Sequence, residues 1–340
     1  MKIAHCVNIN IDGTGGVEAH IIRLCEAMAR QGIHLDIYAA SETESCRALK
    51  DFDYRQYDIM HTHAGMSWPA YHKHKLLRHK IKHVHTLHGV SMDYLIACKA
   101  YLNWRCYYST CMEGLMAHQA DHTICVCADV VRLAKRWLLM PERKMSIVFN
   151  AQNPNSTAIN QRQRIRDKYN IKADDIAVIF VGRGYDPVKG TPEIEAAFDK
   201  LYPKYPNLKL LAMPGSGFNN QPWLIKSGDV KNDQMAFYYA AADIALNASL
   251  SESHALAVIE PMGQGLAIIA AAVGGIPETI IHEHNGLLLN NKRSDIAENL
   301  QRLINDTPLQ NKLAQNAMVD SQKYTWEISA KKTIAIYESL

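Results

Sequence analysis

The chain has 340 residues, of which 48% are hydrophobic and 21% charged, a composition typical of folded proteins that excludes a disordered or fibrous one. At about 150 residues per domain, this length predicts two domains. The net charge of +3 is too small for a protein whose whole surface binds nucleic acid, so no nucleic-acid partner is expected.

Targeting and redox features of the sequence predict a cytoplasmic protein. The first residues, MKIAHCVNIN, begin a strand at once, and no apolar run approaches the 18 residues that a membrane-spanning helix needs. The eight cysteines are irregularly spaced, which favours reduced thiols over a disulfide framework.

The first forty residues alternate between strand and helix. A strand at 2–8 leads into the glycine loop Gly13–Gly16, an amphipathic helix follows, and a second strand occupies 35–39. This βαβ unit predicts a parallel sheet with right-handed crossovers. Apolar runs continue the pattern at 59–61, 83–87, 122–126 and 146–149. Residues 1–152 are therefore predicted to form one Rossmann-like α/β domain.

A polar segment at 150–160, typical of a linker, separates this domain from a second one. Strands are predicted at 177–181, 208–212, 244–247, 267–271 and 286–289, with helices at 193–202 and 234–242. Residues 153–324 are thus a second Rossmann-like domain. Because parallel sheets bind ligands at the carboxyl ends of their strands, the two domains predict a cleft between them.

The most specific pattern lies at 247–279, NASLSESHALAVIEPMGQGLAIIAAAVGGIPET. Glu252 and Glu260 flank an apolar run at 255–259 that suits the start of a helix. Free backbone N–H groups at a helix start bind phosphate. A carboxylate one turn further along accepts hydrogen bonds from the vicinal hydroxyls of a ribose.

Two cations follow the predicted strand at 177–181. Arg183 comes directly after Gly182, and Lys189 follows the loop 184–188. Cations at the carboxyl end of a strand, facing a helix start, neutralise a diphosphate. Together with the two glutamates they predict a pocket for a nucleoside diphosphate.

These motifs, in this order, resemble the retaining glycosyltransferases of family GT4, which have the GT-B fold. The resemblance extends over nearly the whole chain and is carried by GTGG, TLHG, the GR and KG pairs after a strand, E-x7-E, VGGIPE and NGLLL. It implies two Rossmann-like domains, with the helix at 325–340 crossing back to pack on the first.

The resemblance also implies roles for residues of the second domain. Arg183 and Lys189 would bind the donor diphosphate, Glu260 would hold the ribose, and Glu252 would lie near the donor sugar as a catalytic residue. The donor-binding loop continues with Ser253, His254 and Ala255, which stand where the family usually has Gly-Phe-Gly. Their backbone amides remain the same.

In the first domain, the resemblance implies that His88 of the TLHG motif approaches the sugar as a second catalytic residue. Gly15 and Gly16 would close over the donor. Because these cations would neutralise the diphosphate, we expect neither a metal nor a cofactor.

A basic segment distinguishes the first domain. Between Ile59 and Met92 the chain has no Asp or Glu, and it carries eight of the sixteen histidines. The cations of this segment are Lys73, Lys75, Arg78, Lys80 and Lys82. Clustered cations contribute about 1 kcal/mol each at an anionic surface. The segment is either a solvated helix face or a patch that binds an anionic acceptor or the inner face of the plasma membrane.

The sequence therefore predicts a retaining glycosyltransferase that moves a sugar from a UDP- or GDP-sugar to a glycan or lipid-linked acceptor, in cell-surface glycan or glycolipid synthesis. Two alternatives stay open. One is a nucleotide-sugar epimerase or sugar phosphorylase on the same fold, and the other is a non-catalytic subunit that binds a nucleotide sugar.

Overall fold

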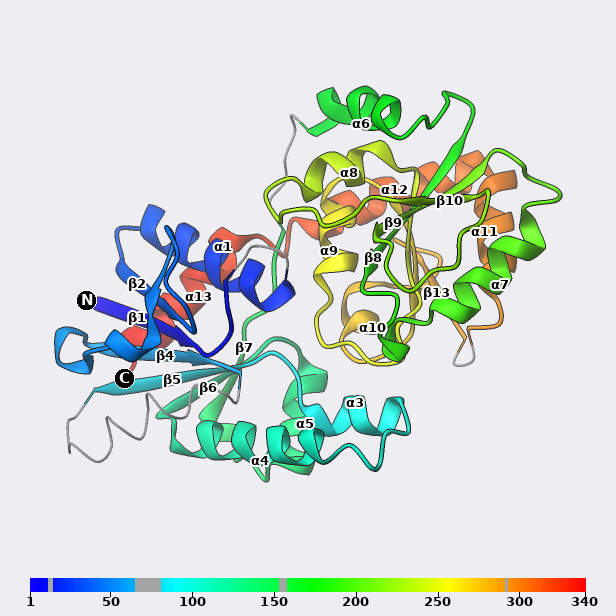
Figure 1. Cartoon of the computed structure of the whole chain (residues 1–340). Coiled ribbons are helices and arrows are strands. Elements are labelled where there is room, and N and C mark those ends of the chain that lie inside the picture. The colour runs from blue at the N-terminus through cyan, green and yellow to red at the C-terminus, as the bar shows by residue number, and fades with distance from the viewer. Residues whose placement is uncertain (12–14, 65–80, 153–157, 291–292) are drawn as a thin grey trace. The chain divides into compact units, whose positions relative to one another are not determined.

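A computed structural model describes residues 1–11, 15–64, 81–152, 158–290 and 293–340 of the chain. They form two compact units (Figure 1). Unit 1 comprises Met1–Asn150 and Trp326–Leu340, and unit 2 comprises Ala151–Thr325. These bounds lie within two residues of the domain limits predicted from the sequence.

Unit 1 is built on a seven-stranded parallel sheet of order β3-β2-β1-β4-β5-β6-β7. The strands are β1 Lys2–Val7, β2 His34–Ala39, β3 Arg47–Ala48, β4 Ile59–His63, β5 Lys82–Leu87, β6 His122–Cys125 and β7 Met145–Ile147. The helices are α1 Gly16–Arg30, α3 Ser91–Ala97, α4 Trp104–Gln119, α5 Ala128–Trp137 and α13 Trp326–Glu338. The strand order reverses direction between β1 and β4, which is where sheets of this class bind ligands.

Helices cover both faces of this sheet, with α1 and α13 on one face and α4 and α5 on the other (Figure 1). Helix α1 buries Ile21, Leu24 and Met28, whose spacing puts them on one side of the helix. Helix α13 belongs to unit 1 because it packs on α1 and because the Tyr337 hydroxyl hydrogen-bonds Nδ1 of His61. The C-terminal helix therefore returns to the first domain, as predicted.

Unit 2 contains a six-stranded parallel sheet of order β10-β9-β8-β11-β12-β13. The strands are β8 Ile176–Gly182, β9 Leu208–Pro214, β10 Leu224–Lys226, β11 Ile244–Asn247, β12 Ala267–Ala271 and β13 Leu287–Leu289. The helices are α6 Arg162–Lys168, α7 Thr191–Leu201, α8 Met235–Ala241, α9 Leu256–Gly263, α10 Ile276–Thr279, α11 Ile296–Asn305 and α12 Thr307–Ser321.

The central strand β8 shows how the sheet of unit 2 builds two cores. Val178 and Phe180 pack with residues of α7 and α11, whereas Ile179 packs with residues of α8 and α9. This follows from the strand geometry, since successive side chains point to opposite faces. Both faces are buried, which is why the strand reads as a continuous apolar run.

None of the described helices is both long enough and apolar enough to cross a membrane.

Candidate active site

Two loops of unit 2 meet through a partly buried ion pair. Lys189 ends a short 3-10 turn, Pro187–Lys189, that follows β8, and Glu252 lies in the loop between β11 and α9. Nζ of Lys189 lies 2.6 Å from Oε1 of Glu252, and Oγ of Ser249 donates to the same oxygen at 2.8 Å. Because β8 and β11 are neighbouring parallel strands, both loops leave the sheet at its carboxyl edge.

Both members of this pair are charged. Burial acts to raise the pKa of Glu252, but Lys189 and the hydroxyl of Ser249 outweigh burial and leave this pKa below its usual value. Burial acts to lower the pKa of Lys189, and Glu252 outweighs it and leaves this pKa raised. The edge of the sheet therefore presents an ammonium and a carboxylate that are only 23% and 15% exposed.

Two glycines in the loops around the pair lie close to backbone carbonyl oxygens. Gly190, directly after Lys189, has φ +72°. A Cβ there would overlap with the carbonyl oxygen of Ala248. Gly274 has φ +53°, and a Cβ on it would overlap with the carbonyl oxygen of Glu252. Both positions therefore require glycine.

The VGGIPE segment supports the Glu252 loop from the side. N–H of Gly275 donates to the carbonyl oxygen of Ser253 at 2.9 Å. This bond and the close approach of Gly274 tie the loop after β12 to the loop after β11. The conformation of Ser253, His254 and Ala255 therefore depends on the glycine pair downstream.

Helix α9 begins directly after this loop, with Ala255 as its N-cap. Ala255 supplies no side-chain cap, so the first N–H groups of the helix receive no bond from it. The His254 side chain points into the protein, where Nε2 hydrogen-bonds Oγ1 of Thr279 at 3.1 Å and the ring packs on Tyr324. Burial lowers the pKa of His254 to about 3, so the imidazole is neutral. The loop therefore offers its backbone, not this ring, to a ligand.

The other predicted donor residues of unit 2 take no part in the ion pair. Glu260 sits in the second turn of α9, and its Oε2 accepts a hydrogen bond from the Tyr239 hydroxyl at 3.0 Å. Arg183 is exposed directly after β8, and no described carboxylate lies within ion-pairing distance of its guanidinium. The structure thus brings together Lys189 and Glu252, and leaves Arg183 on the surface.

Unit 1 holds the remaining predicted site residues. Gly15 is the N-cap of α1, where a Cβ would crowd the carboxylate of Glu18, whereas Gly16 is exposed with open space at its Cβ position. His88 directly follows β5 and is half-buried. Its Nε2 lies 3.1 Å from Nδ1 of His63, so His88 belongs to a histidine cluster.

Most of the predicted basic patch lies outside the described residues. This applies to Lys73, Lys75, Arg78 and Lys80. Lys82 is described and is exposed at the first position of β5. The end of the basic segment is therefore a sheet strand and not a helix face.

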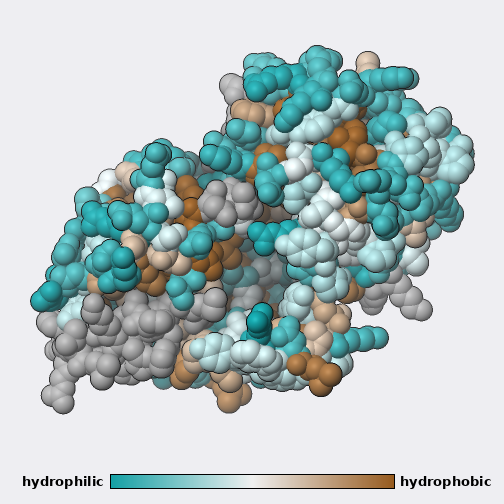
Figure 2. Space-filling model, viewed as in Figure 1, coloured by the Kyte–Doolittle hydropathy of each residue, from teal (hydrophilic) through white to brown (hydrophobic). Residues whose placement is uncertain are grey.

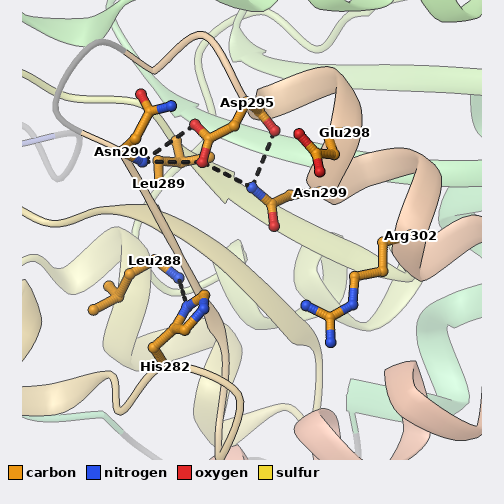
Figure 3. Close-up of a pocket in the computed structure, with 8 residues that line it drawn as sticks. All are labelled: His282, Leu288, Leu289, Asn290, Asp295, Glu298, Asn299 and Arg302. Carbon is orange, nitrogen blue, oxygen red and sulfur yellow. Dashed lines mark hydrogen bonds between the residues drawn. The ribbon is translucent and has the colours of Figure 1, made fainter.

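A cavity of about 500 Å³ lies elsewhere in unit 2, beside β13 and α11 (Figure 3). Its lining residues are His282, Leu288, Leu289, Asn290, Asp295, Glu298, Asn299 and Arg302. Asp295 is turned inward, where its carboxylate accepts hydrogen bonds from the backbone of Asn290 and the side chain of Asn299. None of the predicted site residues lines this cavity.

Sequence reasoning missed two residues that hold the predicted carboxylates. Ser249 hydrogen-bonds Glu252, and Tyr239 hydrogen-bonds Glu260. Ser249 carries a detectable signal, because it lies among polar residues directly after the apolar strand β11. Tyr239 carries none, because it lies on α8, in another part of the sequence, and reaches Glu260 only through helix packing.

Comparison with known proteins identifies the two halves of the chain separately. Residues 161–319 match the family model described as glycosyl transferases group 1, and residues 43–155 match the model described as glycosyltransferase family 4. The first match contains the ion pair of Lys189 and Glu252, and the second contains His88.

Two similar proteins are, by name, a glycosyltransferase and a glucosyldiacylglycerol synthase. An uncharacterised glycosyltransferase of Methanocaldococcus jannaschii is 24% identical over 89% of this chain and 80% of its own length. Alpha-monoglucosyldiacylglycerol synthase of Acholeplasma laidlawii is 28% identical over 53% of this chain and 48% of its own.

Solved structures share the fold over the whole chain. Sucrose-phosphate synthase of Thermosynechococcus elongatus has a TM-score of 0.82 at 19% identity, covering 100% of this chain and 99% of its own. The Anabaena protein HepE, solved in complex with UDP and glucose, has a TM-score of 0.80 at 15% identity, with both chains fully covered.

The ion pair predicts how Lys189 titrates. Burial acts to lower the pKa of Lys189, and the charges of Glu252 and Asp186 act to raise it. Replacing Glu252 by Gln removes the larger of these two charges. The pKa of Lys189 should therefore fall relative to wild type, as followed by NMR of isotope-labelled lysine side chains. Glu260→Gln, in the same motif, is the control and should leave the pKa of Lys189 unchanged. An unchanged pKa in Glu252→Gln would contradict the pairing.

Proposed function

The chain belongs to the glycosyltransferases of family GT4 with the GT-B fold, and we propose that it transfers a sugar from a nucleoside-diphosphate donor to an acceptor hydroxyl with retention of configuration. The observation that carries this proposal is the ion pair of Lys189 and Glu252 beside the start of α9. It joins a cation suited to a diphosphate with a carboxylate suited to sugar hydroxyls at the carboxyl edge of one sheet.

The residues around this pair suggest how the donor is held. The diphosphate would be bound by Lys189, by Arg183 and by the N–H groups at the start of α9. Glu260, one turn into the helix, would accept hydrogen bonds from the ribose. Lys189 would exchange part of its contact with Glu252 for the phosphate, an anion that also favours the charged form of the lysine.

The proposed reaction proceeds on one face of the sugar. The bond between the anomeric carbon and the diphosphate oxygen breaks while the bond to the acceptor oxygen forms on the same face. The acceptor proton passes to the departing phosphate, and Lys189 and Arg183 stabilise the charge of that phosphate. Burial holds the pKa of His88 well below its usual value, so a neutral imidazole would approach the sugar hydroxyls.

The donor we propose is a UDP-sugar. HepE, which shares the fold, was solved with UDP and glucose bound. A GDP-sugar is the second candidate, since the loops that contact a base do so through backbone groups common to many sequences.

The acceptor we propose is lipid-linked or carried on a cell-surface glycan, reached at the inner face of the plasma membrane. A surface of unit 1 supports this: around α3 and α4 it exposes Tyr101, Leu102, Trp104, Tyr107 and Tyr108. Figure 2 shows a few hydrophobic (brown) residues among pale and hydrophilic ones on this part of the molecule. Leu102 is 99% exposed and Trp104 67% exposed. Exposed aromatic rings beside cations favour an interfacial location on lipid. The Acholeplasma relative is named for a glucosylated diacylglycerol.

Lys189→Ala tests the donor site. Loss of one charge-assisted contact is worth about 1.5–3 kcal/mol, so kcat/KM for the nucleotide sugar should fall roughly 10- to 150-fold. Steady-state kinetics with a fixed acceptor measures this. Lys200→Ala, an exposed lysine at the end of α7, is the matched control and should behave as wild type. Unchanged donor kinetics in Lys189→Ala would remove the donor-site assignment.

The stereochemistry of the product tests the mechanism. The one-face reaction predicts that the anomeric configuration of the donor is preserved in the first product formed. Proton NMR of the anomeric signal during early turnover reads this directly, and an inverted anomeric centre would exclude the proposed route.

Incubation with the donor alone distinguishes an epimerase, which interconverts the donor without any acceptor.

Liposome flotation tests the membrane surface. Wild-type protein should float with vesicles that contain anionic lipid and remain below with zwitterionic ones. Replacing Leu102 and Trp104 by Ser should reduce flotation severalfold, because these side chains supply the exposed apolar area. The same replacement at the exposed residues Ile159 and Tyr185 of unit 2 is the control. Equal flotation of all three proteins would contradict the proposed surface.

A further inference from the structure

A cluster of histidines lies inside unit 1, where the strand order reverses. His5 and His61 are partners across β1 and β4, His63 ends β4, and His88 directly follows β5. His20 reaches the cluster from the second turn of α1. His5, His20, His61 and His63 are each at most 2% exposed. Buried ring nitrogens normally have hydrogen-bond partners, so each of these imidazoles should bond a neighbouring group.

One part of the cluster is closed by hydrogen bonds. Nε2 of His63 lies 2.9 Å from Nδ1 of His5, and Nε2 of His5 lies 3.4 Å from the Tyr337 hydroxyl. That hydroxyl also bonds Nδ1 of His61, whose Nε2 lies 2.7 Å from Oγ1 of Thr86. Neutral rings satisfy this chain in either direction of donation. In one of them, His63 donates to His5, His5 to Tyr337, Tyr337 to His61, and His61 to Thr86.

A second part is left open. The same direction of donation leaves a lone pair on Nδ1 of His63, which faces Nε2 of His88 at 3.1 Å. Nδ1 of His20 donates to Oδ1 of Asn150 at 2.8 Å, and this puts a lone pair on Nε2 of His20 as well. Nε2 of His20 is buried and has no hydrogen-bond partner among the described residues. A buried acceptor left in this way is costly unless it binds something.

We propose that His20, His63 and His88 bind a divalent transition-metal ion of the Zn²⁺ type. One ring nitrogen from each of the three lies within 4.8 Å of the others. Nitrogens around tetrahedral Zn²⁺ lie about 3.4 Å apart, because each Zn–N bond is about 2.0–2.1 Å. The pair of His63 and His88 is already at this spacing, and the third nitrogen needs a shift of about 1.5 Å at most. Three imidazoles leave a fourth position for water or a ligand.

Two of the three rings, His20 and His63, have the surroundings of metal-bound histidines. Ligating histidines commonly donate their second N–H to an amide or another acceptor, which fixes the tautomer. Asn150 plays this part for His20, and His5 plays it for His63. Burial lowers the pKa of His20 to about 4 and holds the pKa of His63 and of His88 well below the usual value, so the rings are neutral, the form that binds metal.

Access to the site passes through His88. This residue is half-buried and lies just beyond the end of β5, whereas the other two ligands are buried. Without metal, and in the direction of donation given above, His88 donates from Nε2 to His63. To ligate, it moves that proton to Nδ1, so binding requires a change of tautomer and no net release of a proton.

The site is made of unit 1 residues alone, and its existence does not rest on the proposed transferase activity. The other group of three histidines, His5, His61 and His63, is the less suitable one. Both ring nitrogens of His5 and of His61 already hydrogen-bond protein groups. A metal there would have to break the closed chain.

The experiment uses the full-length chain without an affinity tag, stripped with a chelator and titrated with Zn²⁺ or with Co²⁺. One ion should bind per chain, with the visible absorption of tetrahedral Co²⁺. X-ray absorption at the zinc edge should show imidazole nitrogens at about 2.0 Å. A protein that binds no stoichiometric ion would overturn the proposal.

Variants identify the ligands. His20→Asn keeps a donor near Asn150 and removes Nε2, and His88→Ala removes the half-buried ligand. Each should weaken metal binding more than about 100-fold. The reason is that loss of a group that only hydrogen-bonds a ligand already costs about 10- to 100-fold in metal affinity. His85→Asn is the matched control, since His85 is also buried, with Nδ1 bonded to Thr62 and Nε2 without a described partner. It lies outside both groups and should bind as wild type.

Folding of each variant is followed by its melting temperature and circular dichroism. Should the His20 variant fail to fold, the His88 variant alone decides the ligand set. Wild-type affinity in folded His20→Asn and His88→Ala, or equal loss in His85→Asn, would overturn the assignment of the three ligands.

Discussion

The ion pair between Lys189 and Glu252 joins two loops that leave neighbouring strands of the second sheet. Both side chains are mostly removed from water, yet each remains charged because its partner outweighs the effect of burial. Removing one partner of such a pair typically costs 3–5 kcal/mol, because the other charge is left buried and alone. Gly190 and Gly274 let the backbone of the two loops approach the carbonyl oxygens of Ala248 and Glu252 closely. A preformed charged edge of this kind is what a diphosphate-binding site requires.

Unit 1 is built on the same kind of parallel sheet, but its buried histidines are neutral and not charged. The carboxyl edge of its sheet is lined with imidazoles. Burial lowers the pKa of these rings and keeps them neutral, whereas Lys189 and Glu252 stay charged because they are paired. Tyr337 from the C-terminal helix is part of this network, through its bond to His61. The return of α13 to unit 1 therefore completes the interior of the first domain as well as covering a face of its sheet. His88 belongs to the histidine cluster through its contact with His63, and it also lies where the chain leaves β5.

Much of the fold was predictable from local pattern. The buried central strands of both sheets read as apolar runs, and the order of strand and helix implied parallel sheets. The edge strands β3 and β10 were missed because they have only two and three residues, too few to show a period. Of the two alternatives for the basic segment, a helix face does not apply at Lys82, which starts β5 one residue before the predicted strand and pairs with β4.

The sequence by itself determined the family pattern and the residue types of the site: two glutamates around a helix start, two cations after a strand, and a glycine pair downstream. Only the tertiary structure decided the partners. Lys189 and Glu252 are 63 residues apart and meet because their strands are neighbours, while Arg183, close to Lys189 in sequence, stays on the surface. His254 turns inward to Thr279, and His20 meets His63 and His88 across three elements. Contacts between distant segments depend on sheet order and helix packing, which no local pattern encodes.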